Sequence, residues 1–550
     1  MSTLLTSKTL IVPHRARAAA AALLFTLTLL ALSVAPSRAL AQGAPPTSAP
    51  PDLDAYVAQV LKAFDVPGVS LAIVKDGQVV LQKGYGVRTL GQADPVTDQT
   101  LFGIASNSKV FTATALALLV EEGKIEWDAP VQRYLPAFQM WDPFVTRELT
   151  VRDLLVHRSG LGLGAGDLLW WPPSTYDRPE IARRLRYIRP ATSFRSAYAY
   201  DNVLYLVAGQ VIEAVSGRTW EQFIRERILA KVGMTGSFPR YDDGPKERLA
   251  TPHAPIDGQV RVVKPFASDN TNPAGGIISS ARDMARWVSV LLNEGQLADG
   301  SRLFSNASAR QLMTLVTPQP VGPPPAPLPA LRANFRGYAL GLGVHDYRGR
   351  LVVTHTGGLP GYVSKVTMLP ELELGVVVLT NQESGEAFSS LTWQIVDHYL
   401  NAPKTDWIAG FQQMRARNQA DVQTAAKKAA AGRDTSSKPS LPLAKYAGTY
   451  TDEWYGDIAI DHDNGKLTLR FTKTPALIGE LEHYQYDTFI VRWRDRELRA
   501  DAYVIFALDA DGSVDQIKMR AVSPETDFSF DFHDLLLRPA KAAAASASHN

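Results

Sequence analysis

One serine of the chain is followed three residues later by a lysine: Ser106 and Lys109, in the string FGIASNSKVF. Positions three apart share one face of a helix, so the lysine amine can reach the hydroxyl, while a helix N-terminus adds free N–H groups and a positive end. A serine hydroxyl attacks a carbonyl only when one group takes its proton and another stabilises the oxyanion. The pair therefore indicates a nucleophilic serine, although Ser106 could instead only cap the helix.

Two later motifs carry further polar side chains. Tyr200 and Asn202 form a YDN string just before an expected helix, and His355 and Gly357 form an HTG string at the end of an apolar strand. A second glycine, Gly358, follows, and adjacent glycines after a strand let another backbone, such as an extended substrate, approach closely. Taken singly, each motif also fits a structural role as an aromatic packing group, a helix cap or a buried histidine.

Several other catalytic signatures are absent from the sequence. It contains no GxSxG nucleophile elbow, no HExxH, no GxxxxGK[ST] and no GxGxxG before a helix. It also contains no cysteine, which excludes thiolate nucleophiles, disulfides and Cys-based metal sites. We therefore expect neither a cofactor nor a metal.

The three motifs in this order resemble the serine β-lactamase and penicillin-binding-protein superfamily, especially its class C β-lactamase, D-aminopeptidase and esterase branch. Two further strings strengthen the resemblance, LTVRDLLVHRSGL at 149–161 and NPAGGIISSARDMARWV at 272–288. It covers residues 53–400 and implies an α+β, β-lactamase-like/DD-peptidase fold, in which an antiparallel sheet is flanked by helices and joined by an all-helical region. His157 and Ser159, in the first string, are assigned to a structural turn.

The resemblance also implies roles for individual residues. Ser106 would be acylated, and Lys109 and Tyr200 would share the removal and return of its proton. Which of the two is the general base stays open, because a phenol of pKa ~10 and an amine of pKa ~10.4 both need a perturbed environment. Asn202 would orient Lys109 and the substrate amide, and the N–H groups of Ser106 and Gly358 would form the oxyanion hole.

One residue departs from the pattern of the penicillin-processing enzymes. His355 precedes Thr356 and Gly357 where β-lactamases and many transpeptidases have the lysine of a KTG triad. An imidazole of pKa ~6.5 is largely neutral at pH 7 and holds a carboxylate poorly. Peptidase or esterase activity on a small acyl substrate is therefore ranked above the β-lactamase or DD-carboxypeptidase alternative. A non-catalytic protein that binds peptides or cell-wall fragments is the third hypothesis.

Hydrophobic patterning predicts the elements that position these residues. Segments 69–74 and 78–87 read as a hairpin around Asp76 and Gly77, and segments 351–354, 363–369 and 375–379 read as three successive strands. Helices are expected from Val110 onward and over 203–216. Strands at both ends with helices between them indicate one sheet assembled from the two ends of the region. Trp170 and Trp171 are expected in an aromatic loop on the cleft wall.

A second domain is expected after a helical and polar linker at 401–442. Residues 443–539 carry short β-like runs with Asn464-Gly465 and Asp511-Gly512 turns, typical of a small all-β barrel. Strings such as KYAGTYTDEWYGDIAI resemble the lipocalin-like domain appended to some exported members of the superfamily. The sequence leaves open whether this domain gates the cleft or mediates oligomer contacts. A disordered tail is expected at 540–550.

The N-terminus carries the signs of export. Residues 1–41 contain basic residues, an uncharged run at 18–35 and an Ala-Leu-Ala string, as in a signal peptide, followed by a Pro-rich tether at 42–52. An uncleaved anchor is the alternative, and only it would bring the chain to a membrane. Both interpretations predict a periplasmic or secreted protein. The net charge is +2, and the basic signal accounts for all of it, so no electrostatic case for nucleic acid remains. Homo-oligomerisation stays open.

Overall fold

The computed structural model describes residues 46–540. The predicted signal peptide at 1–41 and nearly all of the predicted tail at 540–550 lie outside the described residues. Among the described residues, no helix has the length and apolarity needed to span a bilayer.

The main sheet has eight antiparallel strands in the order β2-β1-β12-β11-β10-β9-β8-β7. Their bounds are β1 Gly68–Lys75, β2 Gln78–Gly86, β7 Thr317–Pro318, β8 Arg336–Tyr338, β9 Gly343–Tyr347, β10 Arg350–Leu359, β11 Tyr362–Leu369 and β12 Leu374–Thr380. The first strand pairs with the last, with Val69 opposite Thr380. The structure therefore confirms the hairpin, the three successive strands and a sheet assembled from the two ends of the region.

Both faces of this sheet are covered, which explains the continuous apolar run of β12. Val376 and Val378 enter one core with α1 (Leu53–Ala63) and α11 (Gly385–Tyr399), and Val377 and Leu379 enter the other. Because side chains alternate across a strand, a strand buried on both faces needs apolar residues at every position. Helix α9 (Ala281–Leu292) packs on the second face.

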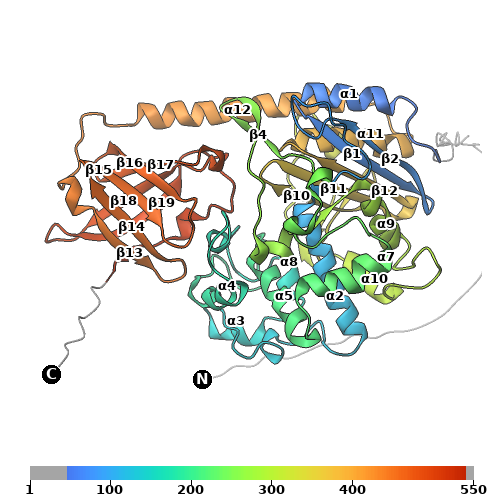
Figure 1. Cartoon of the computed structure of the whole chain (residues 1–550), viewed down its shortest axis with the longest axis horizontal. Helices are drawn as coiled ribbons and strands as arrows, with labels where there is room; N and C mark the ends of the chain where they lie inside the picture. The colour runs from blue at the N-terminus through green and yellow to red at the C-terminus, as the bar shows by residue number, and fades with distance from the viewer. Residues whose placement is uncertain (1–45, 541–550) are drawn as a thin grey trace, which may run out of the picture. The chain divides into compact units, whose positions relative to one another are not determined.

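A helical region holds the predicted catalytic segments (Figure 1). Helix α2 (Lys109–Glu121) is buried on nearly all sides, in keeping with its mostly apolar sequence, and packs against α5 (Val203–Ser216). Helix α5 ends at Gly217 in the left-handed conformation, with φ of 70°. The shorter elements are β3 Phe102–Gly103, α3 Pro143–Glu148, α4 Arg178–Arg184, α6 Trp220–Phe223, α7 Ala230–Val232, β4 His253–Ile256, β5 Gln259–Val262, α8 Asn272–Gly275, β6 Ile278–Ser279 and α10 Asn306–Met313.

Helix α12 (Trp407–Ala431) leads to a second antiparallel sheet in the order β19-β18-β17-β16-β15-β14-β13-β20. A bridge between Ile517 of β19 and Leu537, next to β20, nearly closes it into a barrel. The strands are β13 Gly448–Asp452, β14 Gly456–Asp463, β15 Lys466–Phe471, β16 Ile478–Gln485, β17 Thr488–Trp493, β18 Ala502–Leu508, β19 Val514–Ala521 and β20 Arg538–Pro539. The predicted small all-β barrel is confirmed, with Asn464 and Gly465 both at positive φ in a hairpin turn.

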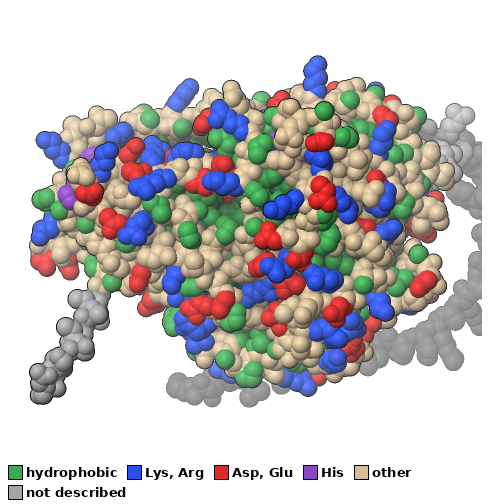
Figure 2. All heavy atoms as spheres, viewed as in Figure 1, with side chains coloured by type: hydrophobic (Ala, Val, Ile, Leu, Met, Phe, Trp, Pro, Cys, Tyr) green, Lys and Arg blue, Asp and Glu red, His purple; other side chains and the backbone are tan. Residues whose placement is uncertain are grey.

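Polar contacts join the barrel to the first region. The Lys264 amine lies 2.9 Å from the Asp495 carboxylate, and the Arg499 guanidinium donates to Glu383 at 2.8 Å. On the face shown in Figure 2, basic and acidic side chains are interspersed over the surface. This face therefore presents no large field of a single sign.

Candidate active site

The turn that carries Ser106 is a short 3-10 helix, Ala105–Ser108, immediately before α2. Ala105 has a φ of 50°, a left-handed conformation that costs free energy for a residue with a side chain. The surrounding structure fixes the turn: the Asn107 amide donates to the Ser364 hydroxyl at 2.8 Å, and that hydroxyl donates to the Ile104 carbonyl at 2.7 Å. Ser106 is thus held at the end of a rigid helix with its side chain partly exposed.

Strand β10 approaches this turn at Gly357. A Cβ atom at Gly357 would lie 2.2 Å from the Ile104 carbonyl oxygen and 2.9 Å from the Ala105 Cβ, whereas one at Gly358 would meet nothing within 4 Å. The two glycines therefore serve different purposes. Gly357 lets the strand reach the turn of Ser106, whereas Gly358 lies where the strand has open space beside it.

The Lys109 amine makes three short polar contacts although its side chain has no exposed surface. Its Nζ lies 3.0 Å from Ser106 Oγ, 2.7 Å from Asn202 Oδ1 and 3.0 Å from the Ala274 carbonyl oxygen. Burial lowers the pKa of Lys109 to about 7, and the charges of Asp167 and Asp201 oppose that shift. The structure thus brings Ser106, Lys109 and Asn202 together as the sequence predicted.

Tyr200 lies against the same amine. Lys109 Nζ is 4.8 Å from the centroid of the Tyr200 ring. Burial raises the pKa of the Tyr200 phenol well above its usual value, and an interaction with the Ser106 side chain works in the opposite direction. The phenol is therefore protonated at neutral pH, while a large fraction of Lys109 is neutral.

The turn around His157 holds the segment that contains Tyr200 and Asn202. The Ala199 N–H donates to the His157 carbonyl at 3.0 Å, and the Asp201 N–H donates to His157 Nδ1 at 3.1 Å. The imidazole packs against the Tyr200 ring in a tilted arrangement, with 4.2 Å between ring centroids and 35° between ring planes. Burial lowers the pKa of His157 well below its usual value, so the ring stays neutral. These contacts agree with the structural role assigned to the turn.

Asp167 was not among the predicted site residues. The Asn202 amide nitrogen donates to its carboxylate at 2.8 Å, and the Trp170 indole donates at 3.0 Å. Burial raises the pKa of Asp167 to about 8. No motif marks an aspartate in the string GAGDLLWW, so the sequence alone gave no signal for it.

The expectation that Trp170 and Trp171 form a cleft wall is wrong. They are only 4% and 7% exposed, respectively, and Trp171 stacks on Phe266 with 4.6 Å between ring centroids. Their rings fill the core behind the site, because bulky apolar surface is stabilised most by burial.

His355 lies near Tyr200, with 6.3 Å between ring centroids, but both of its nitrogens have partners within the protein. Nδ1 is 2.6 Å from the Thr356 carbonyl oxygen, which can only accept, so Nδ1 carries the proton. Nε2 therefore accepts from the Tyr338 hydroxyl at 2.7 Å. Burial lowers the pKa of His355 to about 3. His355 therefore contributes a neutral imidazole whose two nitrogens are both hydrogen-bonded within the protein.

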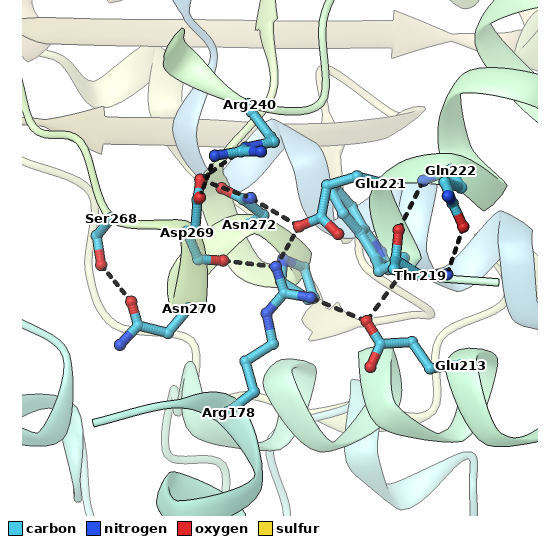
Figure 3. A network of polar contacts seen from close by, with 12 residues as sticks. Arg178, Glu213, Thr219, Glu221, Gln222, Arg240, Ser268, Asp269, Asn270 and Asn272 are labelled. Carbon is cyan, nitrogen blue, oxygen red and sulfur yellow. Dashed lines mark hydrogen bonds and ion pairs between the residues drawn. The ribbon is translucent and has the colours of Figure 1, made fainter. Parts of the chain in front are cut away.

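A polar network holds the start of α8 (Figure 3), the helix whose Ala274 carbonyl is the third acceptor of Lys109. Figure 3 shows Arg178 pointing between Glu213 and Glu221, and its guanidinium donates to Glu213 at 3.0 Å and also to Glu221. The Asn272 amide at the start of α8 donates to Glu221 at 2.7 Å. The network thus anchors α8 beside the lysine.

A cavity of about 140 Å³ adjoins this segment. Gly275 and Gly276 line it from α8 and the following residue, and Leu359 lines it from the end of β10. Tyr241 and Phe266 add aromatic walls, while other lining residues carry polar and acidic groups, Asp242, Ser268 and Asp269. Between residues 46 and 540, no three histidine, cysteine, aspartate or glutamate side chains cluster as metal ligands would.

Comparisons with known proteins match both regions of the chain. The Beta-lactamase family matches residues 53–400, and a domain of unknown function (DUF3471) matches residues 432–539. Unguisins hydrolase ungD of Aspergillus violaceofuscus is 28% identical over 470 residues, 80% of this chain and 82% of that protein. Penicillin-binding protein 4 of Amycolatopsis lactamdurans is 27% identical over 332 residues, 58% of this chain and 81% of that protein.

Two solved structures share the fold. An octameric penicillin-binding protein homologue from Pyrococcus abyssi superposes with a TM-score of 0.53 at 21% identity, covering 88% of this chain and 99% of that one. A class C beta lactamase from Rhodobacter sphaeroides superposes with a TM-score of 0.51 at 22% identity, covering 64% of this chain and 99% of that one.

Proposed function

The chain belongs to the Beta-lactamase family of serine hydrolases, and from this premise we propose that it hydrolyses small peptides, D-amino-acid derivatives or esters through an acyl-enzyme on Ser106. The family match confirms the superfamily resemblance. One observation carries the proposal: a fully buried lysine with a pKa of about 7 has its amine 3.0 Å from the Ser106 hydroxyl. An amine of this kind is a base suited to neutral pH.

The contacts favour Lys109 over Tyr200 as the base of the resting enzyme, because the phenol is protonated there. The neutral Lys109 amine accepts the proton of Ser106 Oγ as that oxygen bonds to the substrate carbonyl carbon. The resulting oxyanion lies between the N–H groups of Ser106 and Gly358 in this scheme. The bond from the carbonyl carbon to the leaving nitrogen or oxygen then breaks, and the leaving group takes a proton from the Lys109–Tyr200 pair.

Deacylation reverses the proton path. A water molecule gives one proton to the same pair and bonds to the acyl carbon, and the bond to Ser106 Oγ breaks. Ser106 recovers its proton, and the carboxylic acid product departs. Asn202 holds Lys109 throughout, because its amide oxygen accepts from the amine at 2.7 Å.

The cavity beside Leu359 supports a compact substrate. Its volume of about 140 Å³ fits one side chain better than a folded polypeptide. The relative from Aspergillus violaceofuscus is named a hydrolase of unguisins, which supports hydrolysis here without fixing the substrate.

Peptide and ester hydrolysis rank ahead of β-lactam hydrolysis. A β-lactam carboxylate calls for a cation, and His355 stays neutral because burial lowers its pKa to about 3. Its two ring nitrogens are also used by Tyr338 and Thr356. A chromogenic cephalosporin should therefore be hydrolysed slowly or not at all.

Export and assembly also belong to this proposal. The predicted signal peptide at 1–41 supports action in the periplasm or outside the cell. The relative of known structure from Pyrococcus abyssi is described as octameric, which supports testing this chain for a homo-oligomer.

A serine-reactive fluorophosphonate tests the proposal directly. We expect mass spectrometry to place one adduct on Ser106, and Ser106→Ala to abolish both labelling and turnover of a p-nitrophenyl ester. Ser196→Ala, which removes an exposed hydroxyl a few residues before Tyr200 in the chain, serves as the control and should behave as wild type. A folded protein that does not react, or that binds peptides equally well with Ser106→Ala and never turns them over, would be a binding protein instead.

A further inference from the structure

A segment of the C-terminal domain reaches the catalytic site. Between β19 and β20, the chain runs past Tyr200, and the Phe528 ring lies 6.0 Å from the Tyr200 ring, centroid to centroid. The next residue, Ser529, is buried, and its hydroxyl donates to the Asp167 carboxylate at 2.8 Å. The barrel therefore contributes a polar group to the hydrogen bonds behind Lys109.

A second residue of this segment holds the backbone around Asp167. The buried Asp531 carboxylate accepts from the N–H of Gly166 at 2.7 Å and from the N–H of Leu168 at 3.0 Å. These two N–H groups flank Asp167 in the chain. A carboxyl group that accepts from the N–H groups on either side of a residue fixes the backbone at that residue.

The fit between the loop and the segment is close. A Cβ atom at Gly164 would lie 2.7 Å from the Phe528 carbonyl oxygen, and Gly164 has a φ of 70°. The Gly164 N–H also donates to the Tyr200 carbonyl at 2.9 Å. The loop at 164–168 is thus held between the barrel segment and the segment that carries Tyr200.

Asp167 determines which way the Asn202 amide faces. Its carboxylate accepts from the Asn202 nitrogen, and this contact directs the amide oxygen toward the Lys109 amine. If the amide were reversed, its nitrogen, which can only donate, would face the Lys109 amine, whose single lone pair is needed for the proton of Ser106. With the amide fixed, the Lys109 amine is held facing Ser106 at 3.0 Å.

We propose that Ser529 and Asp531 of the C-terminal domain are positioning residues of the hydrolase: they hold Asp167, which orients Asn202, which aims Lys109 at Ser106. The inference rests on the proposed function, since it concerns the geometry of the acylation step. It also gives the barrel a task that neither cleft gating nor oligomer contact describes.

A matched pair of variants isolates the hydroxyl of Ser529. Ser529→Thr and Ser529→Val have the same shape and differ only in the group that donates to Asp167. We expect Ser529→Val to lower kcat for a p-nitrophenyl ester about tenfold relative to Ser529→Thr, with KM changed by less than about twofold, because removing a donor from a buried acceptor costs about this much. The labelling rate of Ser106 by a fluorophosphonate should fall in parallel.

Ser523→Ala, which removes a surface hydroxyl from the same segment, is the control and should match wild type. Thermal unfolding of each variant shows that the folded protein is being compared. Equal kcat values for the Thr and Val variants, or a difference confined to KM, would overturn the positioning role while the hydrolase assignment stands. A wild-type protein without turnover or labelling at Ser106 would overturn the proposed function itself, and this inference with it.

Discussion

Two buried lysines lie on opposite faces of the main sheet, and only one of them is placed for chemistry. Lys109 touches three oxygen atoms, among them the Ser106 hydroxyl at 3.0 Å. Lys365 of β11 places its amine over aromatic rings, 5.3 Å from the centroid of Phe388 and 5.0 Å from that of Trp393. Burial lowers the pKa of both, to about 7 for Lys109 and about 8 for Lys365.

The different surroundings of Lys109 and Lys365 show that a lowered pKa does not by itself identify a catalytic base. Lys365 directly follows Ser364, whose hydroxyl supports the nucleophile turn, and alternation along the strand sends the lysine to the other face. There it meets the aromatic rings of Phe388 and Trp393 on α11. Catalytic use of Lys109 therefore depends on the hydroxyl within its reach, in addition to its desolvation.

The largest difference between the two lysines is expected when the amine of each is removed in turn. Lys109→Met should lower kcat/KM for a p-nitrophenyl ester by about 10³-fold or more, because the general base is lost and Ser106 keeps its proton. Lys365→Met should leave kcat/KM within about threefold of wild type. Comparable losses in the two variants, both folded by circular dichroism, would show that position relative to Ser106 is not what distinguishes them.

The pH dependence of activity should also distinguish Lys109 from Lys365. Only the neutral amine of Lys109 can accept a proton, so kcat/KM should rise about tenfold per pH unit up to a pH near 7 and then level off. Asp167 and Asp201 raise the pKa of Lys109 and titrate with it as a coupled set. Stopped-flow or plate assays between pH 5 and about 9 give the profile.

The same rise of kcat/KM with pH should be found in Lys365→Met. If kcat/KM kept rising up to the ordinary lysine pKa of ~10.4, or if the pH at which it levels off shifted in this variant, the assignment of the base to Lys109 would be contradicted.

The smallest expected effect concerns stability and belongs to Lys365. Its pKa falls from 10.5 unfolded to about 8 folded, so the unfolded state binds more protons between these values and the stability of wild type rises with pH there. Lys365→Met removes that dependence. Its stability relative to wild type should therefore be greatest below pH 8 and shrink by up to about 3 kcal/mol toward pH 10.5. Urea unfolding at several pH values measures this, and parallel pH curves for the two proteins would refute it.

Much of the fold could be predicted because its signals are local. The hairpin turn at Asp76 and Gly77, the apolar strands and the left-handed Gly217 after α5 all follow from patterns within a few residues. Ser106 and Lys109 were found for the same reason, since one helical turn holds both.

The contacts that complete the site could not be predicted in this way. Asp167 lies in a loop with no motif, and Ser529 reaches it from another domain, 362 residues along the chain. The roles of Trp170 and Trp171 depended on which surface covers them, and that is a property of the assembled core. Long-range loop contacts leave no periodic trace in a sequence.

The hydrogen bond between Ser529 and Asp167 also has a consequence for the order of events during biosynthesis. Ser106 and Lys109 are synthesised before this contact can form, because Ser529 follows Asp167 by 362 residues in the chain. In a chain truncated before residue 529, Asp167 lacks this donor, so we expect such a chain to hold Lys109 less firmly against Ser106.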